Sequence, residues 1–331
     1  MKISGSILAV NDNYYEYAKQ LKYAHIDCIH VDIFQNGKYK IKDLLEFDET
    51  FPPLDVHLIY ETINDTDIEA LNKAKVSYVN IQYENLKDKS TIVKMDEDLL
   101  CSFGLAFTVN TPLAVIDEYL KYSKQILFMC SEPGISGAGF DERNYERIEE
   151  FHRKHPEISI CVDGGIDAQK AEFMAALGVS MIVSGSYLCK GYEQLGVNAY
   201  SLKHKESVDI KARNKMIPIA SLPIVSISDS FERTINVMNR YHLGLDFVVN
   251  EDGFCGVIAD GDIRRGFIKY GKDIFDKTAG ELMNSNPYTI GGDKTIREVY
   301  EDISKLHMGI DVIPVINDGR LIGGINLRMG T

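Results

Sequence analysis

Short apolar runs alternate with amphipathic segments through the first two thirds of the chain. A run of four to eight apolar residues that is bounded by polar residues or glycines is typical of a buried strand. The predicted strands lie at Ile3–Val10, Cys28–Ile33, Val56–Tyr60, Tyr78–Ile81, Leu105–Thr108, Ile126–Met129, Ile158–Val162 and Met181–Val183.

Between these runs, apolar residues recur at intervals of three and four, which predicts helices. One helix has a suitable N-cap in Asp167, and Gly178 follows it as a C-terminal stop. Strands alternating with helices over about 200 residues predict a parallel (β/α)8 TIM barrel, with an open doubly wound sheet as the alternative. We favour the barrel because polar residues end several separate strands, and a closed ring brings those ends together. The helices are expected at Tyr14–Tyr23, Asp65–Lys75, Pro112–Tyr122, Asp141–Lys154 and Ala168–Leu177.

The last third of the chain contains an internal repeat. The segment His242–Asp246 recurs as His307–Asp311, at an offset of 65 residues. Each copy leads into a strand, a polar turn and a second strand. A duplicated unit of about 60 residues predicts two modules that pack against each other, because one alone buries too little apolar surface.

These patterns divide the chain into an α/β barrel and a smaller α+β pair. We place the barrel at residues 1–209 and the pair at residues 216–331, with its modules at about 216–275 and 276–331. The charged stretch at 203–215 contains the end of the last barrel helix and a linker.

Composition and charge argue against a nucleic-acid partner, a membrane span and a signal peptide. The 331 residues carry a formal net charge of -13, which disfavours nucleic acid. No apolar run reaches the roughly 18 residues of a transmembrane helix, and Met1–Ser6 is too short and polar for a signal peptide. The six cysteines show no C-x-x-C spacing, so we expect free thiols and a cytoplasmic location.

Four polar side chains follow or end the predicted strands. His30 and Asp32 are two residues apart on one strand and therefore share a face, while His57 and Asp163 end two other runs. Two histidines and two carboxylates suit one divalent ion such as Zn, Fe, Mn or Co. Any one of them is more often an ordinary polar residue at a strand end, but the four together favour a metal site.

Three glycine-rich segments follow the sixth, seventh and eighth predicted strands, at Glu132–Gly139, Asp163–Gly165 and Ser184–Ser186. Barrel enzymes often bind phosphate through backbone N–H groups at such loops, where glycine permits close approach. Tight turns without a ligand are the alternative. Three successive loops of this kind favour a phosphorylated small molecule.

The barrel resembles ribulose-phosphate 3-epimerase over nearly its whole length. The resemblance rests on a combination of motifs, since no single one is specific. They are Ser4–Leu8, His30–Ile33, Asp55–Leu58, Gly104–Ala106, Met129–Gly137, Val162–Ile166 and Ile182–Ser186.

The resemblance implies proton transfer at a metal. His30, Asp32, His57 and Asp163 would ligate the ion, Asp32 would remove the C3 proton of a ketose phosphate, and Asp163 would return one to the opposite face through a cis-enediolate. It further implies substrate contacts from Ser6, His57, Met129, Gly134, Gly137, Gly164, Gly165, Gly185 and Ser186.

The chain departs from the family where the sugar wall would lie. Phe34 and Ile59 replace methionines, Gln82 replaces a histidine, and Thr108-Val109 replaces Asn-Pro. Relative to the family, this chain therefore keeps the candidate metal ligands but differs in the residues expected to face the sugar. The resemblance therefore implies a ketose phosphate as the substrate: ribulose 5-phosphate, xylulose 5-phosphate or a related one, including a hexulose phosphate.

The C-terminal repeat resembles a pair of CBS modules. Gly256–Arg265 is similar to their nucleotide-contacting turn, which makes Asp262 a candidate ribose ligand for an adenine nucleotide. Ala259 replaces the usual Thr or Ser, and the second copy, Gly323–Met329, lacks the aspartate. We therefore rank a structural or dimerising role slightly ahead of nucleotide sensing and expect a homo-oligomer. The Asp-Gly-Asp-Ile-Arg-Arg variant is similar to that of pairs attached to enzymes of surface-polysaccharide sugar supply.

Two alternatives remain for function. A decarboxylase barrel would be expected to show Asp-x-Lys-x-x-Asp at a strand end, and we find none; aldose–ketose isomerisation is the related alternative. A degenerate barrel that acts as a nucleotide-sensing or regulatory protein through its CBS pair is the other, although both aspartates are present.

Overall fold

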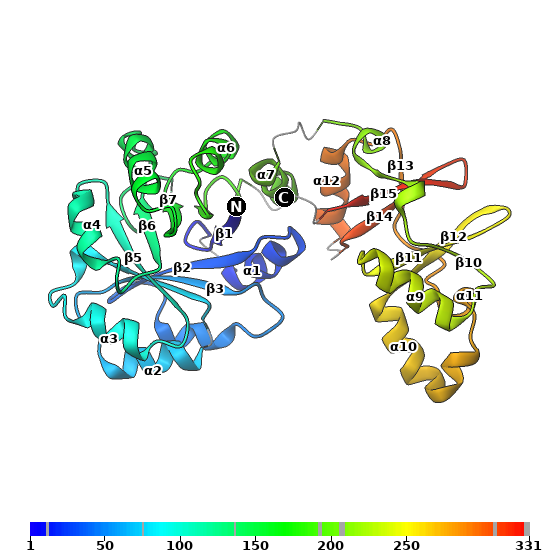
Figure 1. Ribbon diagram of the computed structural model, residues 1–331, viewed down its shortest axis with the longest axis horizontal. Coiled ribbons are helices and arrows are strands. Elements are labelled where there is room, and N and C mark those ends of the chain that lie inside the picture. Colours follow the sequence, from blue (N-terminus) through cyan, green and yellow to red (C-terminus); the bar gives the residue numbers. More distant parts are fainter. Residues whose placement is uncertain are drawn as a thin grey trace. The chain divides into compact units, whose positions relative to one another are not determined.

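The computed structural model describes residues 1–10, 13–74, 76–135, 137–190, 194–204, 209–306 and 310–327. The chain divides near residue 206 into two compact units, a barrel and a smaller α+β unit (Figure 1). No helix in these ranges is long and apolar enough to cross a membrane.

The first unit is a closed barrel of parallel strands, which confirms the predicted fold class. β1 ends at Ser6, earlier than the predicted end at Val10, because the chain turns there: the Leu8 amide donates to Ser6 Oγ and the Val10 amide to the Ile7 carbonyl. The strands are β1 Lys2–Ser6, β2 Cys28–Phe34, β3 Leu54–Ile59, β4 Tyr78–Gln82, β5 Ser102–Thr108, β6 Gln125–Met129, β7 Ser159–Asp163 and β8 Met181–Ser184.

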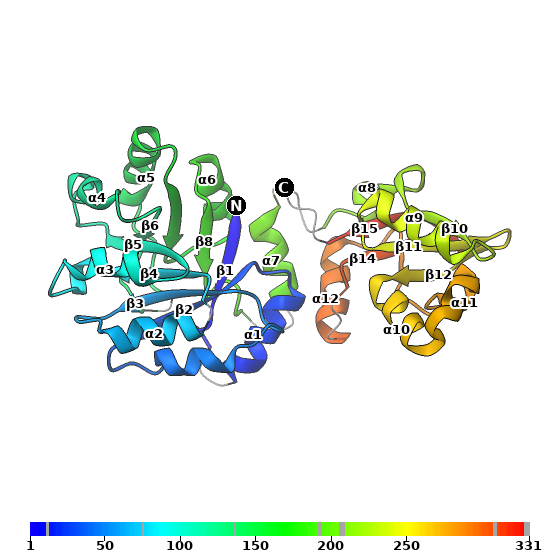
Figure 2. The same ribbon diagram turned by 60° about the horizontal axis from the view of Figure 1, so that its bottom comes forward.

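Helices surround this ring of strands (Figure 2). The Asp167 carboxylate accepts from the Lys170 amide, so the predicted N-cap is confirmed. Helix α5 begins at Arg143 rather than at Asp141, whose carboxylate instead accepts from the Arg143 amide. The helices are α1 Tyr14–Tyr23, η1 Ile41–Glu46, α2 Asp65–Lys73, η2 Tyr83–Asn85, α3 Thr91–Asp98, α4 Leu113–Tyr119, α5 Arg143–Lys154, α6 Ala168–Ala176 and α7 Leu195–Lys203.

Alternate side chains of the strands fill the barrel interior. An apolar group that includes Cys28, Leu127 and Met181 packs there. On the same face of β2 and β7, later residues are polar: His30 and Asp32 follow Cys28, and Asp163 follows Cys161. This switch from apolar to polar leaves the C-terminal ends of the strands for chemistry, as is usual in barrels.

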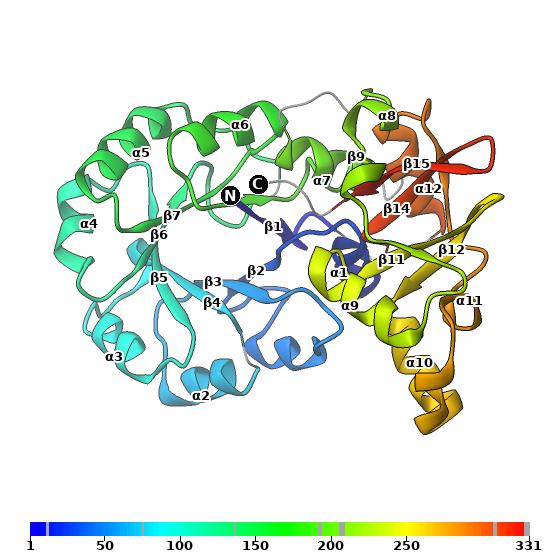
Figure 3. The ribbon, with the colours of Figure 1, turned by 45° about the vertical axis from the view of Figure 1, so that its right-hand side comes forward.

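The second unit contains two sheets, ordered β10-β11-β12 and β13-β14-β15-β9 (Figure 3). Its strands are β9 Ile217–Pro218, β10 Ile224–Ser226, β11 Leu245–Asn250, β12 Gly253–Ala259, β13 Ile290–Gly291, β14 Val312–Asn317 and β15 Arg320–Asn326. Its helices are α8 Ala212–Lys215, η4 Ile219–Ser221, α9 Phe231–Tyr241, α10 Asp260–Tyr270, η5 Gly271–Asp276, α11 Ala279–Leu282 and α12 Ile296–Leu306.

The structure contains the predicted duplication, but the two corresponding hairpins are offset by a different number of residues than the predicted 65. The hairpins β11–β12 and β14–β15 both carry an irregularity, after Val248 in one and after Val315 in the other, which sets an offset of 67. Asp246 therefore corresponds to Ile313, whereas Asp311 precedes β14. Residue identity alone gives the offset of 65, and the part of the repeat at 307–309 lies outside the described residues.

Candidate metal centre and phosphate loops

The four candidate ligands converge in the barrel. His30 and Asp32 lie on β2, His57 on β3 and Asp163 at the end of β7, and one ligand atom of each lies within 4.8 Å of all the others. Strand register explains part of this: Asp32 is the β2 partner of His57. Both histidines are fully buried, Asp32 is 4% exposed and the Asp163 side chain is 18% exposed. The structure therefore brings together residues from three strands.

His30 presents a buried ring nitrogen with no hydrogen-bond partner among the described residues. Its Nε2 lies 3.5 Å from Asp32 Oδ1 and 3.9 Å from Asp163 Oδ2. Its Nδ1 lies 2.8 Å from Asp55 Oδ2 and must donate to that carboxylate. The Nε2 lone pair therefore faces two carboxylates, an arrangement that a cation would satisfy.

His57 leads to the same conclusion. Its Nε2 donates to Gln82 Oε1 at 2.8 Å, and Gln82 Nε2 in turn donates to Glu84 Oε2 at 2.5 Å, which fixes the orientation of the amide. His57 Nδ1 lies 3.0 Å from Asp32 Oδ1. In the neutral ring that nitrogen carries a lone pair, so two acceptors face each other unless a proton or a metal ion lies between them. The donor set fits a divalent ion.

The supporting polar groups had no role in the sequence prediction. Asp55 also accepts from Asn80 Nδ2 at 3.3 Å, and Asn80 Oδ1 accepts from Gln125 Nε2 at 3.0 Å. The signal that could have found Asp55 is its spacing of two residues before His57, which places both on one face of β3. Outer groups of this kind orient metal-binding histidines.

The two aspartates differ in their affinity for a proton. Burial disfavours the Asp32 carboxylate, but the charge and hydrogen bonds of His30 and His57 hold its pKa below the usual range. Burial raises the pKa of Asp163 to about 6, and the nearby Asp32 charge adds to this effect while His30 opposes it. Two carboxylates with separated pKa values suit one proton acceptor and one donor.

The glycine loops gather around these aspartates. A cavity of about 40 Å³ is lined by Asp32 and Asp163 and by most of the predicted substrate contacts. The backbone has positive φ at Gly134, Gly137, Gly164 and Gly165, which favours glycine. Of the predicted contacts, the cavity lining includes Ser6, Gly134, Gly137, Gly164, Gly165, Gly185 and Ser186.

Met129 does not line this cavity. It is 2% exposed and packs in the barrel interior with Leu127 and Cys161, although it is the strand partner of Asp163. Its predicted contact with the substrate stays a prediction.

Phe34 separates this cavity from a larger one. A Cβ atom on Gly134 would lie 1.8 Å from Phe34 Cζ, so the ring packs directly on the Gly134 backbone. Beyond it lies a cavity of about 620 Å³, lined among others by Phe34, Ile59, Thr108 and Glu132. Three positions at which the chain departs from the family thus line one cavity, and Glu132 lines both.

Asp262 lies in the second unit, at the start of α10. Its Oδ2 accepts from the Ala259 amide at 2.9 Å and its Oδ1 from Arg265 Nη2 at 2.6 Å. The side chain is 11% exposed. Both oxygens are therefore engaged in capping the helix and pairing with Arg265, and the nucleotide role of Asp262 stays a prediction.

Comparisons with known proteins agree with these features. The model of the ribulose-phosphate 3 epimerase family matches residues 2–189, and that of the CBS domain matches residues 215–269 and 279–328. The ribulose-phosphate 3-epimerase of Escherichia coli K12 is 27% identical over 175 residues, covering 49% of this chain and 77% of that one. That of Aquifex aeolicus VF5 is 30% identical over 138 residues, covering 40% and 62%.

One similar solved structure is that of CBSX2 in complex with AMP. It is 21% identical, covers 35% of this chain and 89% of that chain, and has a TM-score of 0.31.

Proposed function

Because the chain belongs to the ribulose-phosphate 3-epimerase family, we propose that its barrel is a metal-dependent epimerase that inverts C3 of a ketose phosphate. The observation that carries the proposal is the buried cluster in which Asp32 and Asp163 lie beside two histidines whose ring nitrogens face these carboxylates. A pair of this kind can take a proton and return one.

Asp32 and Asp163 share the two proton transfers of the reaction. Asp32, which stays ionised, removes the C3 proton of the bound ketose phosphate. Asp163, the other carboxylate of the cluster, returns one to the opposite face of the cis-enediolate. When bound by His30, Asp32, His57 and Asp163, a Zn, Fe, Mn or Co ion supplies Lewis-acid polarisation of the substrate oxygens.

The glycine loops hold the phosphate in this proposal. Backbone N–H groups at positive-φ glycines can point together toward an anion and bind it against the negative charge of the chain as a whole. Gly185 and Ser186 complete the lining on the side of Ser6. The sugar then extends over Asp32 and Asp163 toward Phe34.

The test is a panel of ketose phosphates in deuterated water, read by NMR for exchange and inversion at C3. Asp32→Asn and Asp163→Asn should each lower the rate of inversion by about 10²–10⁴-fold, the usual contribution of a positioned acid or base. Exchange without inversion should survive only for the epimer whose C3 proton faces the remaining aspartate. Asp252→Asn, at an exposed turn of the second unit, is the control. Unchanged inversion in either site variant would refute the mechanism.

The same experiment distinguishes the epimerase from the regulatory alternative. A degenerate barrel should neither bind stoichiometric metal nor exchange the C3 proton of any substrate in the panel. Elemental analysis of the purified protein measures the first property directly. Membership in surface-polysaccharide sugar supply stays a proposal by analogy with similar CBS pairs.

We further propose that the second unit promotes self-association in the cytoplasm. Phe267, Ile268 and Phe275 are 45%, 87% and 63% exposed. The rings of Phe267 and Phe275 contact each other and that of Phe231 edge to face. An exposed apolar group of this kind often marks an interface. Ile268→Glu should lower the mass measured by light scattering, with exposed Lys272→Glu as the control; an unchanged mass would reject this role.

A further inference from the structure

Two positions at which the chain departs from the family belong to one hydrogen-bond network at the mouth of the barrel. Gln82, at the end of β4, and Thr108, at the end of β5, both donate to the carboxylate of Glu84. The oxygen of the Gln82 amide accepts in turn from Nε2 of His57. The two departures therefore connect Glu84 to a candidate metal ligand.

The Glu84 carboxylate accepts hydrogen bonds on both of its oxygens. Oε1 accepts from the Thr108 amide at 2.9 Å, from the Thr108 hydroxyl at 3.1 Å and from the Thr111 hydroxyl, while Oε2 accepts from Gln82. Burial raises the pKa of this carboxyl, but the hydrogen bonds outweigh it and hold the pKa below the usual value. An ionised carboxylate has no proton to donate, so the group of Gln82 that faces it must be the NH2 group.

A second contact orients the same amide. Gln82 Nε2 also donates to the Ala106 carbonyl at 3.4 Å, and a carbonyl can only accept. With its NH2 group engaged on that side, the Gln82 oxygen faces the fully buried ring of His57. In the neutral ring the proton therefore lies on Nε2. The lone pair lies on Nδ1, the nitrogen that is 3.0 Å from Asp32 Oδ1.

Support of the loop after β5 does not explain the whole network. That role needs only the contacts of Glu84 Oε1, which connect Thr108 and Thr111 to the residues after β4. The contact of Oε2 with Gln82 adds nothing to this loop. It decides instead between two orientations of a fully buried amide, and only one of them matches a His57 ring whose Nδ1 is free.

We propose that Glu84 is a positioning residue of the metal site: through the Gln82 amide it keeps the proton of His57 on Nε2 and leaves Nδ1 free for the ion. This inference rests on the proposed function, in which His57 is a metal ligand. The opposite orientation of the amide would present its NH2 group to Nε2 and move the ring proton to Nδ1. A protonated nitrogen cannot ligate a metal ion.

The first test is Glu84→Gln, which replaces the carboxylate with an amide of nearly the same size. Three donors of Thr108 and Thr111 face Oε1, so the oxygen of the new amide should lie there and its NH2 group should face Gln82. The Gln82 amide then turns, and its NH2 group meets the Nε2 proton of His57. Affinity for Zn, measured by competition with a chromophoric chelator, should fall about tenfold.

The second test exchanges the two side chains. In Gln82→Glu/Glu84→Gln the carboxylate at position 82 accepts both from His57 Nε2 and from the new amide at position 84, whose oxygen still accepts from Thr108 and Thr111. The net charge is that of the parent chain, and Zn affinity should return close to the parent value. Support of the loop alone predicts no recovery, because the contacts with Thr108 and Thr111 are the same in both variants.

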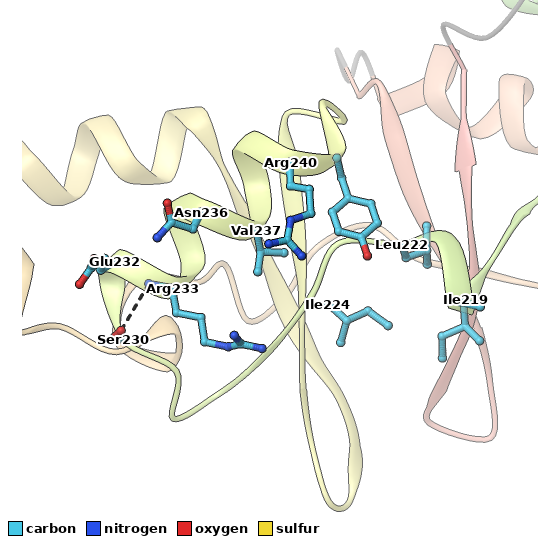
Figure 4. A pocket seen from close by; sticks show the side chains of 11 residues that line it. Ile219, Leu222, Ile224, Ser230, Glu232, Arg233, Asn236, Val237 and Arg240 are labelled. Carbon is cyan, nitrogen blue, oxygen red and sulfur yellow. Dashed lines mark hydrogen bonds between the residues drawn. The ribbon is translucent and has the colours of Figure 1, made fainter.

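Two controls separate this effect from loss of charge and loss of stability. Glu61→Gln removes an exposed carboxylate that pairs with Lys87 rather than with Gln82. Ser230→Ala removes, as the loss of Glu84 does, a side-chain acceptor of a backbone N–H group, here that of Arg233 at 3.3 Å in the second unit (Figure 4). Both variants should bind Zn as the parent chain does, and thermal unfolding measures the stability of each.

A third measurement reads the ring directly and does not depend on whether Glu84→Gln folds. NMR of 15N-labelled histidine side chains in the Zn-loaded parent chain should show the His57 proton on Nε2. A proton on Nδ1, equal Zn affinities of Glu84→Gln and the parent chain, or no recovery in the exchanged variant would overturn this inference alone. A parent chain that binds no stoichiometric metal would refute the proposed function and this inference with it.

Discussion

The Asp55 carboxylate lies 2.8 Å from Nδ1 of His30, while Nε2 of the same ring faces Asp32 and Asp163. Asp55 thereby fixes which nitrogen of His30 carries the proton and which is free. Burial disfavours the charged ring, but Asp55 and Asp32 together raise the pKa of His30 well above its usual value, so without a metal ion Nε2 also holds a proton, which metal binding displaces. The metal site proposed here therefore depends on a residue that is not itself a ligand.

The first prediction concerns a substitution that removes the contact of the Asp55 carboxylate with His30. In Asp55→Asn the amide must orient its oxygen toward His30 and its nitrogen toward the Nδ2 group of Asn80, so two donors meet. Affinity for a divalent metal should fall by about 10–100-fold, the usual effect of losing such a partner. Competition with a chromophoric chelator measures it. Asp117→Asn is a matched control, because it breaks another His–Asp pair of the barrel, with His155 at 2.9 Å; equal affinities of Asp55→Asn and the parent chain would contradict the prediction.

The second prediction concerns metal removal. Two carboxylates and two histidines are held close together in the barrel, so an ion that binds only the folded state should stabilise it. At a free metal concentration of 100 times Kd, the gain is about 2.7 kcal/mol. For a unit of this size, that raises Tm by roughly 5–10 °C.

Calorimetry of the chelated and metal-loaded chain measures this shift. The transition of the barrel should move while that of the second unit does not, and Asp163→Asn should reduce the shift. A metal that leaves both transitions unchanged would count against a site at these residues.

The third prediction tests the phosphate loop. Gly134→Ala forces an L residue into φ +74 and places its Cβ against the ring of Phe34. The left-handed backbone alone costs about 1–2 kcal/mol. The KM for a ketose phosphate should rise about tenfold or more, with a smaller effect on kcat. Gly139→Ala, in the same loop but with nothing within 4 Å of the added Cβ, should leave both constants unchanged; equal effects of the two substitutions would refute the role of Gly134.

The sequence predicted that the four candidate ligands lie together because their placement follows from local rules. A strand alternates its faces, so His30 and Asp32 had to point the same way, and the ends of barrel strands gather. Alternation also places Asp55 on the same face of β3 as His57, but the contacts that the supporting residues make could not be found in this way. Asp55, Asn80 and Gln125 contact one another or His30 across 25 to 45 residues of sequence, and only the register between strands brings them together.

The repeat in the second unit shows the same limit. The repeated His-x-Gly-x-Asp pattern suggested that Asp246 and Asp311 are equivalent, whereas the hairpin register matches Asp246 to Ile313.

The buried position of Asp246 on β11 makes the stability of the second unit depend on pH. The residue is fully buried, and neither carboxylate oxygen has a hydrogen-bond partner in the part of the chain that the structure describes. Burial raises the pKa of Asp246 to about 7. In the unfolded chain an aspartate titrates near pH 4, as usual for an exposed one. Between about pH 4 and pH 7 the folded state therefore holds a proton that the unfolded state has lost.

The fourth prediction follows from this difference. Since the folded state binds more protons, the stability of the second unit should fall as pH rises from about 4 to 7 and then level off, with a total loss of roughly 2–4 kcal/mol. Asp246→Asn, which is neutral at every pH, should remove most of this loss and stabilise the unit at pH 8. Urea unfolding at pH 5 and pH 8 measures both effects. The exposed Asp252→Asn should keep the parent slope. If Asp246→Asn retains that slope too, the buried carboxylate is not its source, because no other property of the substitution depends on pH.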